Sequence, residues 1–281
     1  PLQFNIECFV SPVIKDSSAC TAEDWLKLVK YIQKLQQKQY QHFVIIHGTD
    51  TLSYASAVLA HCLGNSASVV LTGSQYPLLN VNGNDTREFT DATDNLNFAL
   101  DSVSKCSSGV YLAFHHRLIH AQTALKRHTT ELDAFTGIDT NQAISANTEA
   151  FKVDNQLILK AQSFNCLNIM WQPVAIDQQI QNLESFIENP PHVLILQGFG
   201  TGNIAVNDKL IQVLKSIQAK NCAVIINSQV PFGSLDQRYA VSEWITHAKF
   251  LVSNSFSHAD LYAKALKMYL KYDSVEQWHD H

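Results

Sequence analysis

The chain has 281 residues, of which 46% are hydrophobic and 16% charged, and its formal net charge is −5. This composition is that of a globular protein, and the length allows one large domain or two modest ones. The weak negative charge gives no basic footprint for nucleic acid, and no apolar run approaches the roughly 20 residues of a membrane helix. We therefore expect neither nucleic acid nor a membrane as a partner.

The cysteines and histidines point away from disulfide and metal chemistry. The six cysteines are scattered without CxxC spacing, and the twelve histidines form no HExxH pattern. An even cysteine count permits disulfides, but isolated cysteines in a chain of this size are more often buried thiols. The first residues show neither the basic start nor the long apolar core of a signal peptide. We expect a reducing, cytoplasmic setting and no metal site.

In chain order, the first segments predict a strand, a loop and a helix. Residues 4–10 alternate weakly between apolar and polar types, which favours a strand. A loop over residues 12–18 follows. A helix is predicted from Thr21 to about Lys38, because Thr21 followed by Asp24 is close to a capping box and the apolar residues share one face. The loop therefore ends just before a helix.

The next segment combines a strand, a sharp turn and a helix. Four apolar residues over 43–46 predict a strand buried on both faces, and a helix is predicted over 52–60. Gly48 allows the turn between them. Ligands of open parallel sheets bind beyond the carboxyl ends of strands, where Thr49 and Asp50 would lie. A hydroxyl beside a carboxylate suits the activation of a water or nucleophile, but both residue types are also favoured helix N-caps, and spacing alone leaves both interpretations open.

The pattern of strand and helix continues to about residue 116. Further strands are predicted over 67–71 and 109–114, with a long loop over 72–84 and a helix over 91–100 between them. This alternation predicts an α/β fold with a doubly wound, mostly parallel sheet.

We expect two domains. The larger, N-terminal domain covers residues 1–155 and carries the site, residues 156–190 form a connector that ends at Pro190-Pro191, and a smaller α/β domain covers 191–281. The elements expected in the smaller domain are a strand over 192–196, a helix over 208–219 and a strand over 223–227.

Five segments together carry a family resemblance. They are Asp16-Ser17-Ser18 with the helix start after it, His47-Gly48-Thr49-Asp50-Thr51, Thr72-Gly73-Ser74-Gln75-Tyr76-Pro77-Leu78, Asp133-Ala134-Phe135, and Gln197-Gly198-Phe199-Gly200-Thr201-Gly202-Asn203. In this order they resemble segments of the bacterial-type L-asparaginases. The resemblance runs from about Phe4 to about Leu270, and the Asp-Ser-Ser form is closer to the cytoplasmic type I enzymes than to the secreted type II.

The resemblance implies hydrolysis of L-asparagine to L-aspartate and ammonia, without a cofactor, in a homodimer or homotetramer. It implies that Thr49 attacks the small amide substrate or holds the water, and that Asp50 and Lys126 are its proton partners. The residues expected to bind substrate are Asp16, Ser17, Ser18, Gly48, Ser74 and Gln75.

Two departures from the family pattern leave alternatives open. The family's N-terminal Thr-Gly-Gly-Thr-Ile segment, which carries its first nucleophile, is absent from these 281 residues. Either the sequence lacks its natural N-terminus or this nucleophile was lost. The family's Gly-x-Arg-x-x-Lys becomes Ala121-Gln122-Thr123-Ala124-Leu125-Lys126, which keeps the lysine alone. The alternatives are an amidase subunit of a tRNA-dependent amidotransferase and a catalytically inactive relative that binds asparagine.

Overall fold

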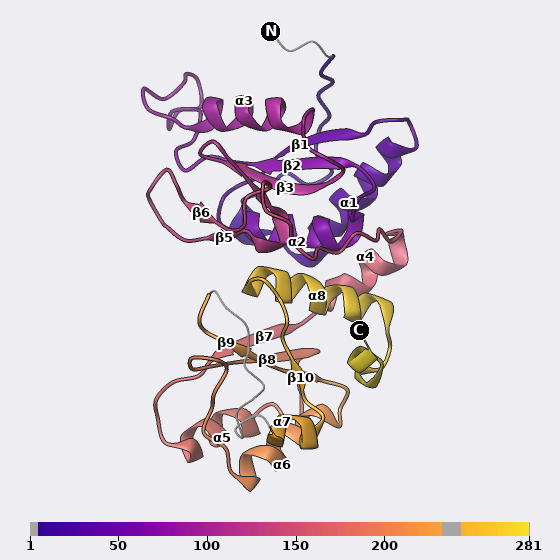
Figure 1. The fold of residues 1–281 in the computed structure, drawn as a ribbon, viewed down its shortest axis with the longest axis vertical. Coiled ribbons are helices and arrows are strands. Elements are labelled where there is room, and N and C mark those ends of the chain that lie inside the picture. The colour runs from indigo at the N-terminus through magenta and orange to yellow at the C-terminus, as the bar shows by residue number, and fades with distance from the viewer. Residues whose placement is uncertain (1–4, 232–242, 281) are drawn as a thin grey trace. The chain divides into compact units, whose positions relative to one another are not determined.

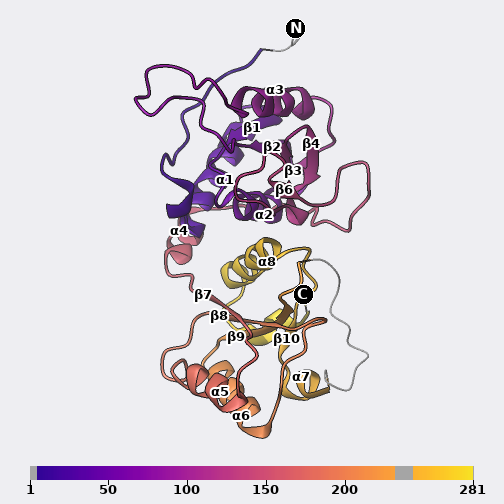
Figure 2. The ribbon, with the colours of Figure 1, turned by 90° about the vertical axis from the view of Figure 1, so that its left-hand side faces the viewer.

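The computed structural model describes residues 5–231 and 243–280, and the structural statements below concern these residues. The chain divides between Gln162 and Ser163 into two compact units, each with its own sheet (Figure 1, Figure 2). We call them the N-terminal unit and the C-terminal unit.

The N-terminal unit is built on a four-stranded sheet in the order β1-β2-β3-β4. The first three strands are parallel, and β4 pairs antiparallel with β3. A short ribbon of β5 and β6 stands apart from this sheet. The strands are β1 (His42–Ile46), β2 (Ser68–Thr72), β3 (Gly109–Phe114), β4 (Arg117–His120), β5 (Leu125–Lys126) and β6 (Phe135–Thr136).

Helices cover both faces of this sheet, as the alternating pattern predicted. Figure 1 shows α3 on one face and α1 and α2 on the other. The capping interaction predicted at the start of α1 is also present. The Asp24 carboxylate accepts a hydrogen bond from the Thr21 backbone N–H at 2.8 Å. The α-helices are α1 (Ala22–Gln36), α2 (Leu52–Leu63), α3 (Ala92–Val103) and α4 (Asn155–Gln162), and the 3₁₀ helices are η1 (Ser17–Ala19) and η2 (Ala121–Thr123).

The strand β1 is less buried than its sequence predicted. A run of four apolar residues favoured a strand covered on both faces, but Phe43, Val44 and Ile45 are half-buried and Ile46 is 71% exposed. The reason is position, since β1 is an edge strand of the sheet and pairs with β2 alone among the described strands. By contrast, every residue of β2 is buried, as expected for a strand inside a parallel sheet.

The first predicted strand is not formed. Phe4 lies outside the described residues, and residues 5–10 have no strand assignment. Side chains hold this segment instead of a backbone ladder. The Phe9 ring meets the Tyr40 ring edge to face with centroids 5.3 Å apart, and the Tyr40 hydroxyl bonds the Glu7 carboxylate. Weak alternation of residue types was therefore a poor guide here.

The C-terminal unit has a second four-stranded sheet, in the order β10-β9-β8-β7, with all strands parallel. The strands are β7 (Cys166–Met170), β8 (Val193–Gly198), β9 (Ala223–Ser228) and β10 (Leu251–Val252). The helices are α5 (Ile176–Glu184), α6 (Asp208–Gln218), α7 (Glu243–Ala248), α8 (His258–Lys271) and the 3₁₀ helix η4 (Val275–Asp280).

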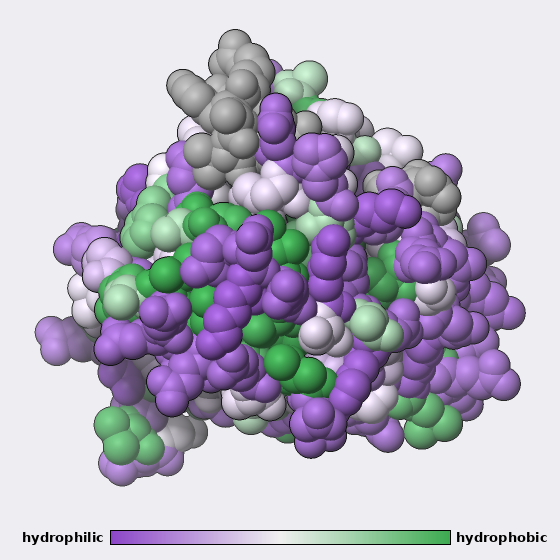
Figure 3. Space-filling view, turned by 90° about the horizontal axis from the view of Figure 1, so that it is seen from below, coloured by the Kyte–Doolittle hydropathy of each residue, from purple (hydrophilic) through white to green (hydrophobic). Residues whose placement is uncertain are grey.

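Alternating residues of β8 and β9 build two cores on opposite faces of this sheet. Leu194 and Leu196 pack with residues of α5, α6 and α7, whereas Val193 and Ile195 pack with residues of α8. Several hydrophobic residues on the α5–α7 side are only partly buried. Figure 3 accordingly shows apolar surface among the polar side chains on that side.

The prediction of a connector over residues 156–190 is wrong. This segment contains most of α4, all of β7 and all of α5, and β7 pairs with β8 from Cys166 to Met170. The division between the compact units falls after Gln162, seven residues beyond the predicted end of the first domain. The short apolar stretches of this segment did not predict a strand, because β7 is an edge strand with an exposed face.

Candidate active site

Three predicted catalytic residues come together at the carboxyl end of β1. Thr49 and Asp50 lie in the turn between β1 and α2, and Lys126 is the last residue of β5. The Lys126 Nζ donates a hydrogen bond to the Thr49 Oγ1 at 2.9 Å and lies 3.7 Å from the Asp50 Oδ1. The lysine side chain is 23% exposed and the aspartate side chain 60%, so the hydroxyl–ammonium contact is partly shielded and the carboxylate faces water.

Lys126 is positioned by its backbone as well as by its side chain. Its N–H donates to the Ser53 Oγ at 3.1 Å, and Ser53 lies buried in the first turn of α2. The strand pairing of Lys126 with Phe135 fixes the other side of the ribbon. Sequence reasoning missed Ser53, and its only signal was a serine next to the first residue of the predicted helix.

Gly48 is required by a close approach of η1 to the turn. A Cβ atom at Gly48 would lie 2.5 Å from the Ser17 Oγ, a distance that leaves no room for a side chain. The Thr51 Oγ1 donates to the Ser17 carbonyl at 2.7 Å. Ser17 is buried, so it packs beneath the turn that carries Thr49.

Asp16 and Ser18 bond each other on the surface. The Asp16 Oδ1 accepts from the Ser18 backbone N–H at 2.8 Å and from the Ser18 Oγ at 2.6 Å. These hydrogen bonds stabilise the carboxylate and lower the pKa of Asp16. Both residues are exposed. The structure thus separates the three loop residues into one that packs inward, Ser17, and two that face solvent.

Ser74 and Gln75 lie in the loop that follows β2, close to the Thr49 turn. A Cβ atom at Gly73 would lie 2.3 Å from the His47 carbonyl oxygen and 3.5 Å from the Thr49 methyl group, so the two loops touch. Ser74 is half-buried in this loop. The Gln75 Nε2 donates to the carbonyls of Thr129 and Glu131 at 3.1 and 3.0 Å. Gln75 therefore ties the β2 loop to the loop between β5 and β6.

Two further residues, missed by the sequence reasoning, hold this loop. Asp91 precedes α3, and its carboxylate accepts from the backbone N–H groups of Gln75 and Tyr76 at 3.0 and 2.9 Å. Asn95 donates to the Gly73 carbonyl at 3.0 Å and accepts from the His115 N–H at 2.9 Å. Together they link the carboxyl ends of β2 and β3. The only available signal was the position of Asp91 at the start of a predicted helix, and this position by itself indicates no more than where the helix begins.

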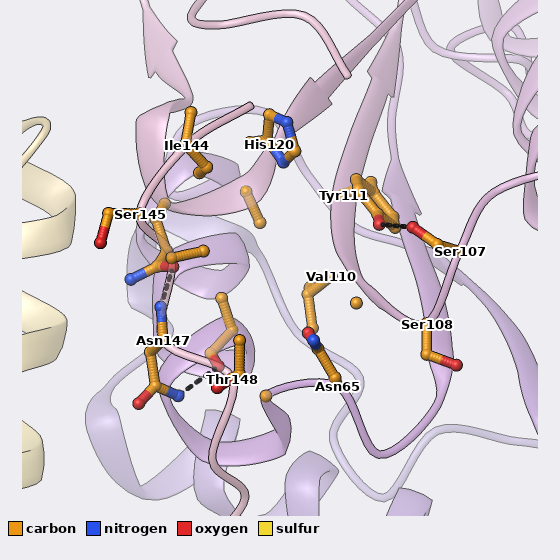
Figure 4. Close-up of a pocket in the computed structure, with 16 residues that line it drawn as sticks. Asn65, Ser107, Ser108, Val110, Tyr111, His120, Ile144, Ser145, Asn147 and Thr148 are labelled. Atoms are coloured by element: carbon orange, nitrogen blue, oxygen red, sulfur yellow. Dashed lines mark hydrogen bonds between the residues drawn. The ribbon is translucent and has the colours of Figure 1, made fainter. Parts of the chain in front are cut away.

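A cavity of about 300 Å³ lies elsewhere in the N-terminal unit. Figure 4 shows it between the segment 144–148 and the start of β3, where the Tyr111 and Ser107 hydroxyls are 2.9 Å apart. It is lined by residues from the amino-terminal side of β2 and β3, such as Asn65 and Gly109, and by none of the predicted catalytic residues. The candidate active site is therefore assigned by its side-chain chemistry and not by this cavity.

Within residues 5–231 and 243–280, no group of three or more histidine, cysteine, aspartate or glutamate side chains is placed to hold a metal ion. In the same part of the chain, no helix has the length and apolar character needed to cross a membrane.

The family match comes from comparison with known proteins. The family model "Asparaginase, N-terminal" matches residues 5–159. The chain is 28% identical to an L-asparaginase of Dirofilaria immitis over 235 residues, which is 80% of this chain and 38% of that protein. It is 27% identical to L-asparaginase 1 of Escherichia coli K12 over 246 residues, 84% of this chain and 70% of that protein. A glutamyl-tRNA(Gln) amidotransferase subunit from Nanoarchaeum equitans is 30% identical over 146 residues, 49% of this chain and 35% of that protein.

A solved structure shares the two-unit α/β fold. The L-asparaginase of Thermococcus kodakarensis superimposes with a TM-score of 0.78 over 95% of this chain and 80% of that chain, at 23% sequence identity. This likeness confirms the predicted fold class. Because the family model spans more than half of the chain, this protein belongs to the asparaginase family.

Proposed function

We propose that this protein hydrolyses the side-chain amide of L-asparagine to give L-aspartate and ammonia. The observation that carries the proposal is the contact of Lys126 with Thr49 at 2.9 Å, beside Asp50 at 3.7 Å. In an activated nucleophile, a hydroxyl contacts a base and a third group orients that base. Here these groups are the Thr49 hydroxyl, the Lys126 amine and the Asp50 carboxylate.

The contact can serve the reaction with Lys126 in either protonation state. With Lys126 in the ammonium form, its N–H bond to the Thr49 oxygen stabilises negative charge that develops there. With the amine neutral, Lys126 accepts the hydroxyl proton as Thr49 attacks the amide carbon or orients a water for that attack. Asp50 then holds the resulting ammonium. Ammonia leaves with a proton returned from Lys126, and water completes hydrolysis of any ester formed on Thr49.

The remaining predicted residues are proposed to bind substrate, except Ser17, which is buried beneath the Thr49 turn. Asp16 and Ser18 offer an exposed carboxylate and hydroxyl at the turn before α1, and Ser74 is half-buried in the loop that touches the Thr49 turn. A free amino acid presents an ammonium and a carboxylate, which these groups complement. Gly48 would let the backbone approach the substrate closely, and Gln75 would hold the loop that covers it.

The test is ammonia release from L-asparagine, measured on this chain and on a form extended to any start codon that lies upstream. Thr49→Val and Lys126→Met should each lower the rate by at least 100-fold in whichever form is active, with Thr246→Val and Lys209→Met as surface controls in the C-terminal unit. Retained turnover by Thr49→Val contradicts the assignment. If neither form releases ammonia while L-asparagine raises the melting temperature, the protein is the inactive binding relative.

A second candidate is an amidase that supplies ammonia to a partner protein. The 30% identity to the Nanoarchaeum equitans amidotransferase protein favours it, although that match covers only 49% of this chain. This candidate predicts a stable complex with a second protein and little hydrolysis by the isolated chain. Co-purification from the native host separates it from a free asparaginase.

We also propose a cytoplasmic homodimer or homotetramer. The support is the family membership and a related solved structure, described as a probable cytoplasmic L-asparaginase from Campylobacter jejuni, which superimposes with a TM-score of 0.70 at 23% identity. Light scattering of the purified protein gives the oligomer count, and a monomer contradicts this part of the proposal.

A further inference from the structure

A tryptophan of α1 contacts the histidine that begins the catalytic turn. The Trp25 Nε1 and the His47 Nε2 are 3.3 Å apart, and Trp25 is 4% exposed. His47 follows the last residue of β1 and precedes Thr49 by two positions. The proposed reaction assigns no role to either residue.

The contacts of the His47 ring determine which nitrogen carries the proton. An indole N–H can only donate, so the His47 Nε2 must be the unprotonated acceptor. The proton of the neutral ring is then on Nδ1, which lies 2.8 Å from the Gly48 carbonyl oxygen and donates to it. The neutral imidazole thus connects α1 to the backbone of the residue that precedes Thr49.

Both ends of this connection are fixed. The Trp25 ring is stacked on the Tyr54 ring of α2, with centroids 6.4 Å apart and planes 6° from parallel. The His47 backbone N–H donates to the Thr72 carbonyl at 2.8 Å, so His47 extends the pairing of β1 with β2. The indole therefore holds a set orientation, and the imidazole is held between it and the Gly48 carbonyl.

We propose that Trp25 and His47 are positioning residues for the turn that carries Thr49 and Asp50. The neutral His47 ring holds the Gly48 carbonyl, and this sets the direction in which Thr49 meets Lys126. The catalytic consequence rests on the proposed function, whereas the geometry of the turn does not.

The neutral form of His47 is essential to this role. A proton on Nε2 would face the indole N–H, and one of the two hydrogen bonds would be lost. Burial lowers the pKa of His47 and favours the neutral ring. The charged residue nearest to His47 in the chain, Asp50, lies 3.7 Å from Lys126, and the carboxylate next to Trp25, Asp24, lies 2.5 Å from Lys15, so both are already paired. The other titratable group of the stack is the Tyr54 phenol.

The first test is a histidine NMR titration of the full chain. We expect His47 to be the Nδ1–H tautomer at neutral pH. Trp25→Phe keeps a ring against Tyr54 but removes the N–H, so the His47 midpoint should rise and the amide signals of Gly48 and Thr49 should move. The matched control is Trp171→Phe in the C-terminal unit, where neither change is expected. An Nε2–H tautomer, or unchanged His47 and Thr49 signals in Trp25→Phe, overturns the proposal.

The second test uses hydrolysis of L-asparagine. Trp25→Phe and His47→Leu should lower kcat about tenfold with KM changed less than twofold, and the acidic limb of the pH profile should move upward in Trp25→Phe. His47→Gln keeps an acceptor for the indole and should recover part of the lost kcat, with His42→Gln, at the start of β1, as the control. Wild-type kcat in His47→Leu overturns the catalytic part. If the wild-type protein is inactive, the proposed function fails, and the NMR signals alone decide the positioning.

Discussion

Lys126 and Thr49 are 77 residues apart in the chain, and their side chains meet at 2.9 Å. The sheet alone does not bring them together, because Lys126 belongs to the ribbon of β5 and β6 and not to the strands beside β1. The link is Ser53, which lies four residues after Thr49 and accepts a hydrogen bond from the Lys126 backbone N–H at 3.1 Å. The turn after β1 therefore carries the partner of the lysine side chain, and the first turn of α2, four residues later, carries the partner of its backbone.

Ser53→Ala should loosen this junction. The change leaves the Lys126 N–H without its partner in a partly buried place, which costs about 1–3 kcal/mol. Urea unfolding should show this loss, and ammonia release should fall because the amine is less well fixed. Ser185→Ala, at an exposed position after α5, is the control and should change neither measurement. Wild-type stability in Ser53→Ala would show that water replaces the serine.

Gly73→Ala should destabilise the protein by overpacking. An added Cβ would lie 2.3 Å from the His47 carbonyl oxygen, and this is a backbone atom that cannot rotate away. Forcing such a contact costs typically about 1–3 kcal/mol. Gly83→Asn is the matched control, because its surroundings are open and asparagine tolerates its positive φ of 69°. Equal unfolding midpoints for the two variants would mean that the β2 and Thr49 loops separate freely.

Much of the N-terminal unit could be predicted from local pattern. The helix α1 follows from its apolar spacing and from Thr21 with Asp24, and β2 and β3 follow from continuous apolar runs. The candidate catalytic residues could not be identified from local pattern. Spacing alone left Thr49 and Asp50 as either helix caps or catalytic groups, and Lys126 was singled out only by the family resemblance.

The errors have a common physical cause, which is dependence on distant neighbours. The burial of β1 depends on how many strands flank it, and the connector prediction failed because β7 gains its stability by pairing with β8. Asp91 was visible as a helix start, but its two bonds to the Gln75 and Tyr76 backbone depend on a loop 15 and 16 residues earlier. None of these relationships leaves a periodic trace in the sequence.

The cysteines should react very unequally. Burial raises the pKa of Cys166 and of Cys222 to about 12, so almost no thiolate is present at neutral pH. Cys8 is exposed. Brief treatment with iodoacetamide at pH 8 should alkylate Cys8 and spare the other two until the protein is unfolded in urea. Labelling of the buried Cys222 in the folded state, found by peptide mass spectrometry, would show that the C-terminal unit opens readily.

Acid should destabilise the protein through two half-buried histidines whose surroundings favour the neutral form. Burial lowers the pKa of His47 and of His258 in the folded state, whereas in the unfolded chain a histidine titrates near 6.5. Below that value the unfolded state binds more protons than the folded state, so the free energy of unfolding falls as the pH falls. Above it both states are neutral, and this contribution to stability is complete.

The loss should therefore begin as the pH drops through about 6.5 and level off below the lowered pKa values of the folded protein. Urea unfolding of the wild type and of His47→Gln with His258→Gln at pH 7.5 and 5.5 gives the test. The double variant should lose less stability between these two pH values, because neither glutamine titrates. His42→Gln, at an exposed position of β1, should keep the wild-type dependence. An equal loss in the double variant would assign the acid sensitivity to other groups, such as carboxylates whose pKa values the fold lowers, of which Asp16 is one.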